Sequence, residues 1–265
     1  MNNLHRELAP ISDGAWEQIE DEARRTFSTR SAARRVVDMP EPAGFGLSAV
    51  GTGHVTSAQA PADGVIAHTR EVRPVVEYRV PFTVSRQAVD DVDRGAEDSD
   101  WDAVKDAAAK LALAEDRTVF HGAAGIEGIG PSSSNARIAL PDDVQDVPGA
   151  VARAISELRR AGVSGSYSLL LSDELYTRVA ETTDHGYPIR DHVARIMGDD
   201  GHIVWAPALD GALIVSERGG DYVLRLGQDV SIGYLSHDDS AINLYLQESF
   251  TFQVNTAEAS VVIGG

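Results

Sequence analysis

The chain of 265 residues contains no cysteine, which excludes disulfide bonds, thiolate nucleophiles and thiolate metal sites. Basic residues are also scarce: 23 Lys and Arg stand against 41 Asp and Glu, giving a formal net charge of −18. Because phosphate binding needs basic patches, this balance argues against nucleic acid as a partner. Acidity alone also fits an ordinary solvated surface, and acidic patches still attract metal cations.

Long apolar runs and a secretory leader are missing as well. No run approaches the ~20 residues that a membrane-spanning helix needs. The first residues, MNNLHRELAP, have neither the apolar segment nor the cleavage site of a signal peptide. We therefore expect a cytoplasmic protein with no membrane partner, which would reach the outside of the cell only without a signal peptide. The hydrophobic content of 43% suffices for a sizeable core, in one large domain or two small ones.

The segment 216–254 has the pattern of successive β-strands. A turn at Gly219-Gly220-Asp221 opens it, and apolar residues then alternate with polar ones. The alternating residues are Tyr222, Leu224 and Leu226, then Val230, Ile232 and Tyr234, then Ile242, Leu244, Leu246, Phe250 and Phe252. Among these strands we find no nucleophile, metal cluster or phosphate loop. So much ordered structure without chemistry indicates a surface with a structural role.

Two amphipathic helices are predicted before this segment. The first begins at Ser12 or Asp13, and its apolar stripe is Trp16, Ile19, Ala23 and Phe27. The second is capped by the run Ser99-Asp100-Trp101-Asp102 and keeps a helical stripe to Val119. Its consecutive Glu115, Asp116 and Arg117 point in different directions on a helix, so we expect a structural salt bridge and not a paired-carboxylate site.

The residues between 122 and 218 have the pattern of an α/β unit. Helices are predicted over 148–161, after Ser172 and over 189–196, and strands over 167–171, 203–206 and 212–215. By contrast, the stretch 40–64 is rich in Gly, Ala, Pro, Ser and Thr and has little periodicity. We interpret it as an extended arm that becomes ordered against a neighbouring subunit, with 50–84 as a long two-stranded excursion.

Motifs for catalysis or metal binding are absent from the sequence. The glycine-rich run 122–130 lacks the Gly-Lys-Ser/Thr ending of a phosphate loop, and 162–166 lacks the second glycine of a nucleophile elbow. His185 and His192 are seven residues apart, outside any zinc spacing. We expect no catalytic residue and no metal. A hydrolase, a protease or a secreted bacteriocin-like factor is the alternative, and it lacks a Ser/His/Asp arrangement.

Short tags along the chain resemble the encapsulin shell proteins of family 1, of the actinobacterial, linocin-like type. They run in order from residue 4 to about residue 259, which is nearly the whole chain. The tags are LHRELAPISDGAW at 4–16, RRVVD at 34–38, GVIAH at 64–68, VPFT at 80–83, SDW at 99–101, AEDR at 114–117, DHGYP at 184–188 and the strands of 216–254.

The resemblance implies an α+β fold like that of the HK97 phage major capsid protein, and no enzymatic activity. It implies residues 1–39 as a luminal helix and arm of the P-domain, 40–84 as the E-loop with flanking strands and 85–121 as the P-domain with its spine helix. Residues 122–218 would form the A-domain, and 219–265 would return to P-domain strands. Copies would assemble into a closed icosahedral shell, a T=1 particle of about 60 subunits. The shell would enclose a dye-decolorising peroxidase or a ferritin-like protein.

Two sites follow from the same resemblance. The cargo's C-terminal peptide would lie in a luminal groove formed by Phe27, Val37, Asp38, Ile232 and Tyr234, although these apolar residues would also suit an ordinary core. The loop of Thr183, Asp184, His185, Gly186 and Tyr187 would surround a five-fold pore for small ions and substrates, although it also fits a plain solvated loop. Some relatives have an aromatic residue near 85–87 that supports flavin binding. Ser85-Arg86-Gln87 has none, so we expect no cofactor.

Overall fold

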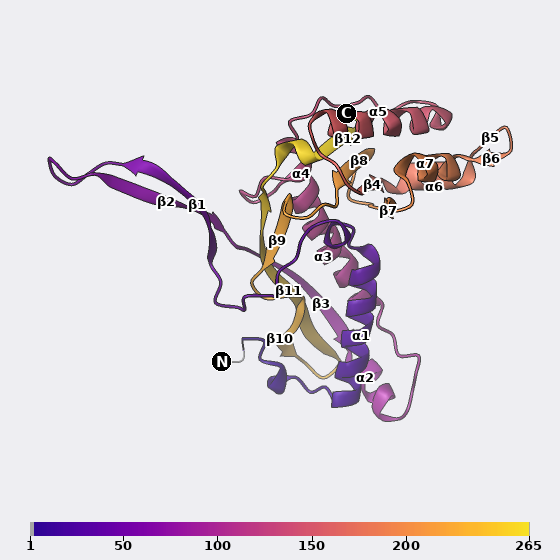
Figure 1. Ribbon diagram of the computed structural model, residues 1–265. Coiled ribbons are helices and arrows are strands. Elements are labelled where there is room, and N and C mark those ends of the chain that lie inside the picture. Colours follow the sequence, from indigo (N-terminus) through magenta and orange to yellow (C-terminus); the bar gives the residue numbers. More distant parts are fainter. Residues whose placement is uncertain (1–2, 265) are drawn as a thin grey trace.

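The computed structural model describes residues 3–264, and Figure 1 shows three parts: a helix-backed antiparallel sheet, a protruding hairpin and a second α/β unit. Among the described residues, no helix combines the length and the apolar character that crossing a bilayer requires. The α+β class predicted from the sequence is confirmed.

The first sheet is organised around one long strand, β11 (Ala241–Val254). Strand β3 (Val76–Ser85) pairs antiparallel with one edge of β11, whereas β10 (Ser231–His237) and β9 (Tyr222–Leu226) pair with the other. Three helices and two short 3-10 segments accompany it: α1 (Asp13–Arg30), α2 (Arg86–Asp93), α3 (Asp102–His121), η1 (Arg6–Leu8) and η2 (Ala33–Arg35).

Helix α1 begins as predicted, because the Ser12 Oγ accepts a hydrogen bond from the Ala15 N–H. Its apolar stripe is buried against α3 and the sheet, in one core cluster with side chains of β3, β10 and β11. The core residues of this cluster include Trp16, Ile19, Ala23, Phe27, Phe82, Val104, Leu111, Ile232, Leu244 and Leu246. The α1 face that carries Phe27 therefore shares one core with α3, β10 and β11.

The protruding hairpin consists of β1 (Ala49–Ala58) and β2 (Ala67–Pro74), which pair antiparallel with an irregularity between Gly51 and Val55. It extends away from the rest of the chain (Figure 1), and large apolar side chains on it are exposed, among them Val55, Ile66 and Val72. The expected two-stranded excursion over 50–84 is wrong at its end. Strand β3 does not continue the hairpin, because its backbone pairs with β11 along its whole length.

The second unit contains the sheet β12–β8–β4–β7, in which only the β4–β7 pair is parallel. Helices α5, α6 and α7 cover its apolar side chains. Its elements are α4 (Ile129–Ser132), η3 (Val144–Asp146), α5 (Val147–Arg160), β4 (Tyr167–Leu171), α6 (Asp173–Glu181), β5 (Thr183–Asp184), β6 (Tyr187–Pro188), α7 (Ile189–Met197), β7 (His202–Trp205), β8 (Ala212–Ser216), η4 (Ala257–Ala259) and β12 (Ser260–Ile263).

The last strand corrects the expected return of 219–265 to the first sheet. Strands β9, β10 and β11 do return there, but β12 pairs antiparallel with β8 of the second unit. Its buried Val261 and Ile263 join the core of that unit. The end of the chain therefore ties the two units together, as the position of the C-terminus in Figure 1 shows.

Candidate functional site

A groove of about 380 Å³ lies between α1, the N-terminal segment and the start of β10. Apolar side chains make up part of its lining, and charged side chains make up the rest. The apolar lining residues are Leu4, Ala23, Phe27, Val230, Ile232 and Leu246, and the polar ones are Arg6, Glu20, Arg24, Ser28, Arg34, Asp229 and Ser231.

The apolar floor belongs to the core as well as to the groove. Phe27 and Ile232 are each only 4% exposed, so they present an edge to the groove and pack with the remainder of their surface. The guanidinium of Arg34 lies over the Phe27 ring, 4.6 Å from its centroid, in cation–π geometry. A ligand in the groove would thus contact a ring whose position is fixed by Arg34.

Arg34 is in turn held by three carboxylates. Its Nε donates to both oxygens of Glu115 at 2.9 Å, and its Nη2 donates to Glu115 at 2.7 Å and to Glu248 at 3.0 Å. Its Nη1 donates to Asp229 at 2.8 Å, at the rim of the groove. Burial by itself would lower the pKa of Arg34, but the hydrogen bond and charge of Glu115 raise it above its ordinary value.

Glu248 is not among the residues predicted from the sequence, and Glu115 is predicted only as part of a structural salt bridge, although both leave a signal in the sequence. Glu248 stands at the inward position of an alternating strand, between Leu246 and Phe250. Glu115 stands four residues after Leu111, on the buried stripe of α3. A carboxylate at an apolar position of either pattern predicts a buried cationic partner. The predicted structural salt bridge in 115–117 exists, and its cation is Arg34.

The N-terminal segment closes one side of the groove. The Tyr234 N–H, on the outer edge of β10, donates to the Leu4 carbonyl at 2.9 Å. The Asn3 side chain donates to Gln228 at 2.8 Å, and Arg6 pairs with Glu20 of α1. Leu4 and Arg6 both line the groove, so its shape depends on residues at the start of the chain.

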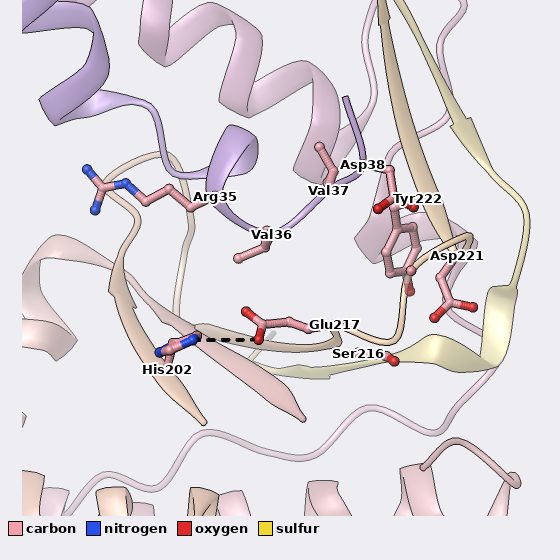
Figure 2. A pocket seen from close by; sticks show the side chains of 10 residues that line it. Arg35, Val36, Val37, Asp38, His202, Ser216, Glu217, Asp221 and Tyr222 are labelled. Carbon is pink, nitrogen blue, oxygen red and sulfur yellow. Dashed lines mark ion pairs between the residues drawn. The ribbon is translucent and has the colours of Figure 1, made fainter. Parts of the chain in front are cut away.

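The five predicted groove residues do not all line the same cavity. Phe27 and Ile232 line the groove together, whereas Val37 and Asp38 line a different pocket of about 290 Å³ beside β8 and β9. Figure 2 shows this second pocket, with Asp38 near Tyr222 and Asp221. The Asp38 carboxylate accepts from the Gly220 N–H at 2.5 Å, which fixes the turn before β9. The Tyr234 hydroxyl lies within hydrogen-bond distance of His237 Nδ1, at 2.6 Å. The Tyr234 side chain packs against the core that contains α1 and lines neither pocket.

The predicted pore loop is a two-residue hairpin between β5 and β6. His185 and Gly186 have φ angles of 46° and 85°, as the tight turn requires. His185 is 97% exposed, and its Nε2 lies 3.7 Å from the Asp184 carboxylate. Tyr187 is exposed and lies edge-on to His192, with the Arg195 guanidinium 5.7 Å from its ring. The hairpin, which begins at Thr183, is at the far end of the second unit (Figure 1).

One cluster resembles the parts of a hydrolase without their geometry. Ser168 of β4 and His202 of β7 come together with Glu217, which directly follows β8, but the buried Ser168 hydroxyl donates to Glu217 and not to the histidine. His202 lies 3.9 Å from Glu217 and 65% of its side chain is exposed. The hydrogen bond of Ser168 goes to a carboxylate, so the serine–histidine contact of a Ser/His/Asp triad is not formed by this cluster. Within residues 3–264, no three His, Asp or Glu side chains gather in a way that could hold a metal ion.

Comparisons with known proteins agree with the tags in the sequence. Residues 1–251 match the family described as "Encapsulating protein for peroxidase". The type 1 encapsulin shell protein of Rhodococcus erythropolis is 58% identical over 98% of this chain and 99% of its own length. That of Mycobacterium tuberculosis is 56% identical over 99% of both chains.

The fold also matches solved capsid-type structures. The virus-like particle from Pyrococcus furiosus has a TM-score of 0.63 at 16% identity, with 94% of this chain and 98% of that chain covered. The capsid of the myovirus XM1 has a TM-score of 0.57 at 10% identity, with 88% and 91% covered. These likenesses confirm the HK97-type capsid fold, and the sequence relatives confirm the resemblance. The chain therefore belongs to the family of type 1 encapsulin shell proteins, which are structural proteins and not enzymes.

Proposed function

We propose that copies of this chain assemble into a closed icosahedral T=1 shell of about 60 subunits that encloses a peroxidase. The observation that carries the proposal is full-length similarity to type 1 encapsulin shell proteins, in a family described by its encapsulation of peroxidase. A ferritin-like protein is the other cargo expected from the resemblance. We place the compartment in the cytoplasm, in agreement with a chain that has no cysteine.

The roles of the segments belong to this proposal. Residues 1–39, 85–121 and most of 219–265 act as the P-domain, and 122–218 together with β12 act as the A-domain. The hairpin β1–β2 acts as the E-loop, which reaches a neighbouring subunit with its exposed apolar side chains. In a single chain, Val55, Ile66 and Val72 are left in water, and an interface would remove them from it.

Cargo capture is assigned to the groove that contains Phe27 and Ile232. It is shallow, partly apolar and lined by Arg6, Arg24 and Arg34, which suits a short extended tail with small apolar anchors. Val37, Asp38 and Tyr234 stay in the proposal only as residues that support the groove from outside it. Many copies of a weak site hold a multimeric cargo firmly through multivalency.

Passage of small ions and substrates is assigned to the hairpin of 183–187. Repeated around a five-fold axis, it would gather the Asp184 carboxylates into a ring of negative charge. Exposed His185 side chains would stand beside that ring. A ring of this kind admits small charged solutes and excludes macromolecules.

Electron microscopy of the purified protein, combined with mass spectrometry of what co-purifies from the native cell, tests the proposal. Uniform hollow particles that contain a peroxidase or a ferritin-like protein are expected. A dispersed monomer of 28.3 kDa at all concentrations would refute shell formation. Empty particles from a cell that produces such an enzyme would refute capture by the groove.

A further inference from the structure

Three carboxylates surround the single guanidinium of Arg34, and two of them are completely buried. Glu115 comes from α3, Glu248 from β11 and Asp229 from the loop before β10. The side chains of Glu115 and Glu248 are 0% exposed, that of Arg34 is 17% exposed and that of Asp229 is 48% exposed. If every carboxylate were ionised, one positive charge would face three negative ones at the bottom of the groove.

One oxygen of this cluster has no donor. Arg34 satisfies both oxygens of Glu115 and the Oε2 of Glu248, whereas the buried Glu248 Oε1 has no hydrogen-bond partner among residues 3–264. A buried carboxylate oxygen left unpaired is costly. A proton on Glu248 removes the deficit, since a carboxyl O–H can donate to the neighbouring Glu115 carboxylate.

We propose that Glu115 and Glu248 share one proton at neutral pH, and that this proton makes Arg34 the positioning residue of the groove by holding its guanidinium against Phe27. Loss of the proton in alkaline solution would then weaken binding of the cargo tail. The inference rests on the proposed role of the groove.

The surroundings of Glu248 also favour its protonated form. Burial, then the charge of Glu115, raises the pKa of Glu248 well above its ordinary value, and the charge of Arg34 opposes the rise. Asp116 faces the same region, with both of its oxygens on the N–H groups of Ala32 and Ala33. The remaining charged groups of the groove, Arg6, Glu20 and Arg24, are all paired along its rim.

The sign of the effect follows from linkage. The folded chain holds a proton on Glu248 at pH values where the unfolded chain has lost it, so the stability of the protonated cluster falls as pH rises. The loss is progressive between the ordinary pKa of a glutamate and the raised pKa of Glu248, and it is complete only above the latter.

The exposure of the side chains in this cluster explains why loss of the proton changes the groove. The side chains of Glu115 and Glu248 are completely buried, whereas that of Arg34, which contacts both, is partly exposed. Water that solvates an ionised pair must therefore enter past Arg34, through the groove. Its entry separates the guanidinium from the Phe27 ring, and the groove loses the surface on which a tail rests.

The test compares assembled shells of four proteins. Glu248→Gln keeps an acceptor for Arg34 and replaces the shared proton with amide donors, and Glu115→Gln leaves Glu248 as the single carboxylate of the pair. Glu97→Gln is the matched control, because it removes the same charge from an exposed surface position. Infrared difference spectra between about pH 6 and about pH 10 report a protonated carboxyl that titrates. Anisotropy of a labelled synthetic peptide, copied from the C-terminal tail of the co-purified cargo and enclosed during reassembly, reports the Kd.

Asp116 contributes one titrating carboxyl band in all four proteins, because burial raises its pKa to about 7. The expected result is a second titrating band in the unmodified protein and in Glu97→Gln, which Glu248→Gln lacks and which moves to lower pH in Glu115→Gln, where the charge of Glu115 no longer raises the pKa of Glu248. Tail binding should weaken roughly tenfold only where the second band titrates, the scale of one charge-assisted hydrogen bond. A missing second band, or equal pH profiles of tail binding in all four proteins, would overturn the shared proton or its coupling to the groove. A second titrating band with no tail binding at any pH would instead refute the proposed groove itself. If Glu248→Gln fails to assemble, Glu115→Gln carries the same comparison.

Discussion

Replacing Ile66 with aspartate should raise the concentration needed for assembly without affecting the fold of the subunit. Ile66 lies at the end of the β1–β2 connection, next to β2, and is 84% exposed in the single chain. A charge there meets only water until a neighbouring subunit covers the hairpin. Ile66→Asp therefore separates the interface from the folding of the subunit.

The magnitude follows from the exposed surface. Fully burying an isoleucine side chain contributes about 1.5–3 kcal/mol, so covering most of Ile66 contributes about 2 kcal/mol per copy. An aspartate removes that contribution and adds the cost of desolvating a charge. Since about 1.4 kcal/mol is tenfold in an equilibrium constant, the concentration needed for assembly should rise at least about tenfold.

Size-exclusion chromatography and electron microscopy over a concentration series measure this threshold, while far-ultraviolet circular dichroism monitors the subunit. Thr56→Asp is the matched control, since it adds the same charge to the same hairpin at an exposed polar position. Assembly of Ile66→Asp at the concentration that the unmodified protein needs would refute the assignment of the hairpin to an interface.

Three further outcomes are expected. Phe27→Ala should release cargo and also lower the melting temperature, because deleting a buried phenylalanine side chain costs about 3–5 kcal/mol; a fully loaded shell of unchanged stability would contradict this. Replacing both Asp184 and His185 with alanine should change substrate flux to an enclosed enzyme, measured as its turnover in intact shells, and equal turnover would argue against the pore. Burial raises the pKa of Asp116 to about 7, although hydrogen bonds from two backbone N–H groups act to lower it. The contribution of Asp116 to stability should therefore fall as pH rises from about 4 to about 7. Asp116→Asn should remove this pH dependence from the melting temperature and cost about 1–3 kcal/mol, since its amide nitrogen would face a backbone N–H.

Most helices and strands could be predicted because each follows a local apolar period. The α1 cap at Ser12 and the alternation of β9, β10 and β11 are examples. Partner choice could not be predicted, because a strand's own period does not say which strand pairs with it. Thus the sequence predicts β3 as part of the hairpin although it pairs with β11, and β12 as part of the first sheet although it pairs with β8.

The groove was predictable in part for the same reason. Phe27 and Ile232 lie on apolar faces that meet in the core, and both line one cavity, as the resemblance implies for two residues of a shared groove. Val37 and Asp38 follow the 3-10 segment η2, which directs the chain toward β9. There Asp38 forms a β-bridge with Val223. No local pattern specifies that change of direction. Glu248 was visible as a break in an alternating strand, but only the fold identifies Arg34 as its partner.

The pairing of β11 also determines when a subunit can fold. Gln247 and Glu77 hydrogen-bond across the β11–β3 ladder although 170 residues separate them. At a synthesis rate of about 5–20 residues per second, β3 waits on the order of ten seconds or more on the ribosome before β11 exists. During that interval the apolar faces of α1 and β3 have no sheet to cover them, and such non-local contacts form slowly. We therefore expect the proposed shell to grow from subunits whose synthesis has been completed, and not from neighbouring nascent chains on one messenger.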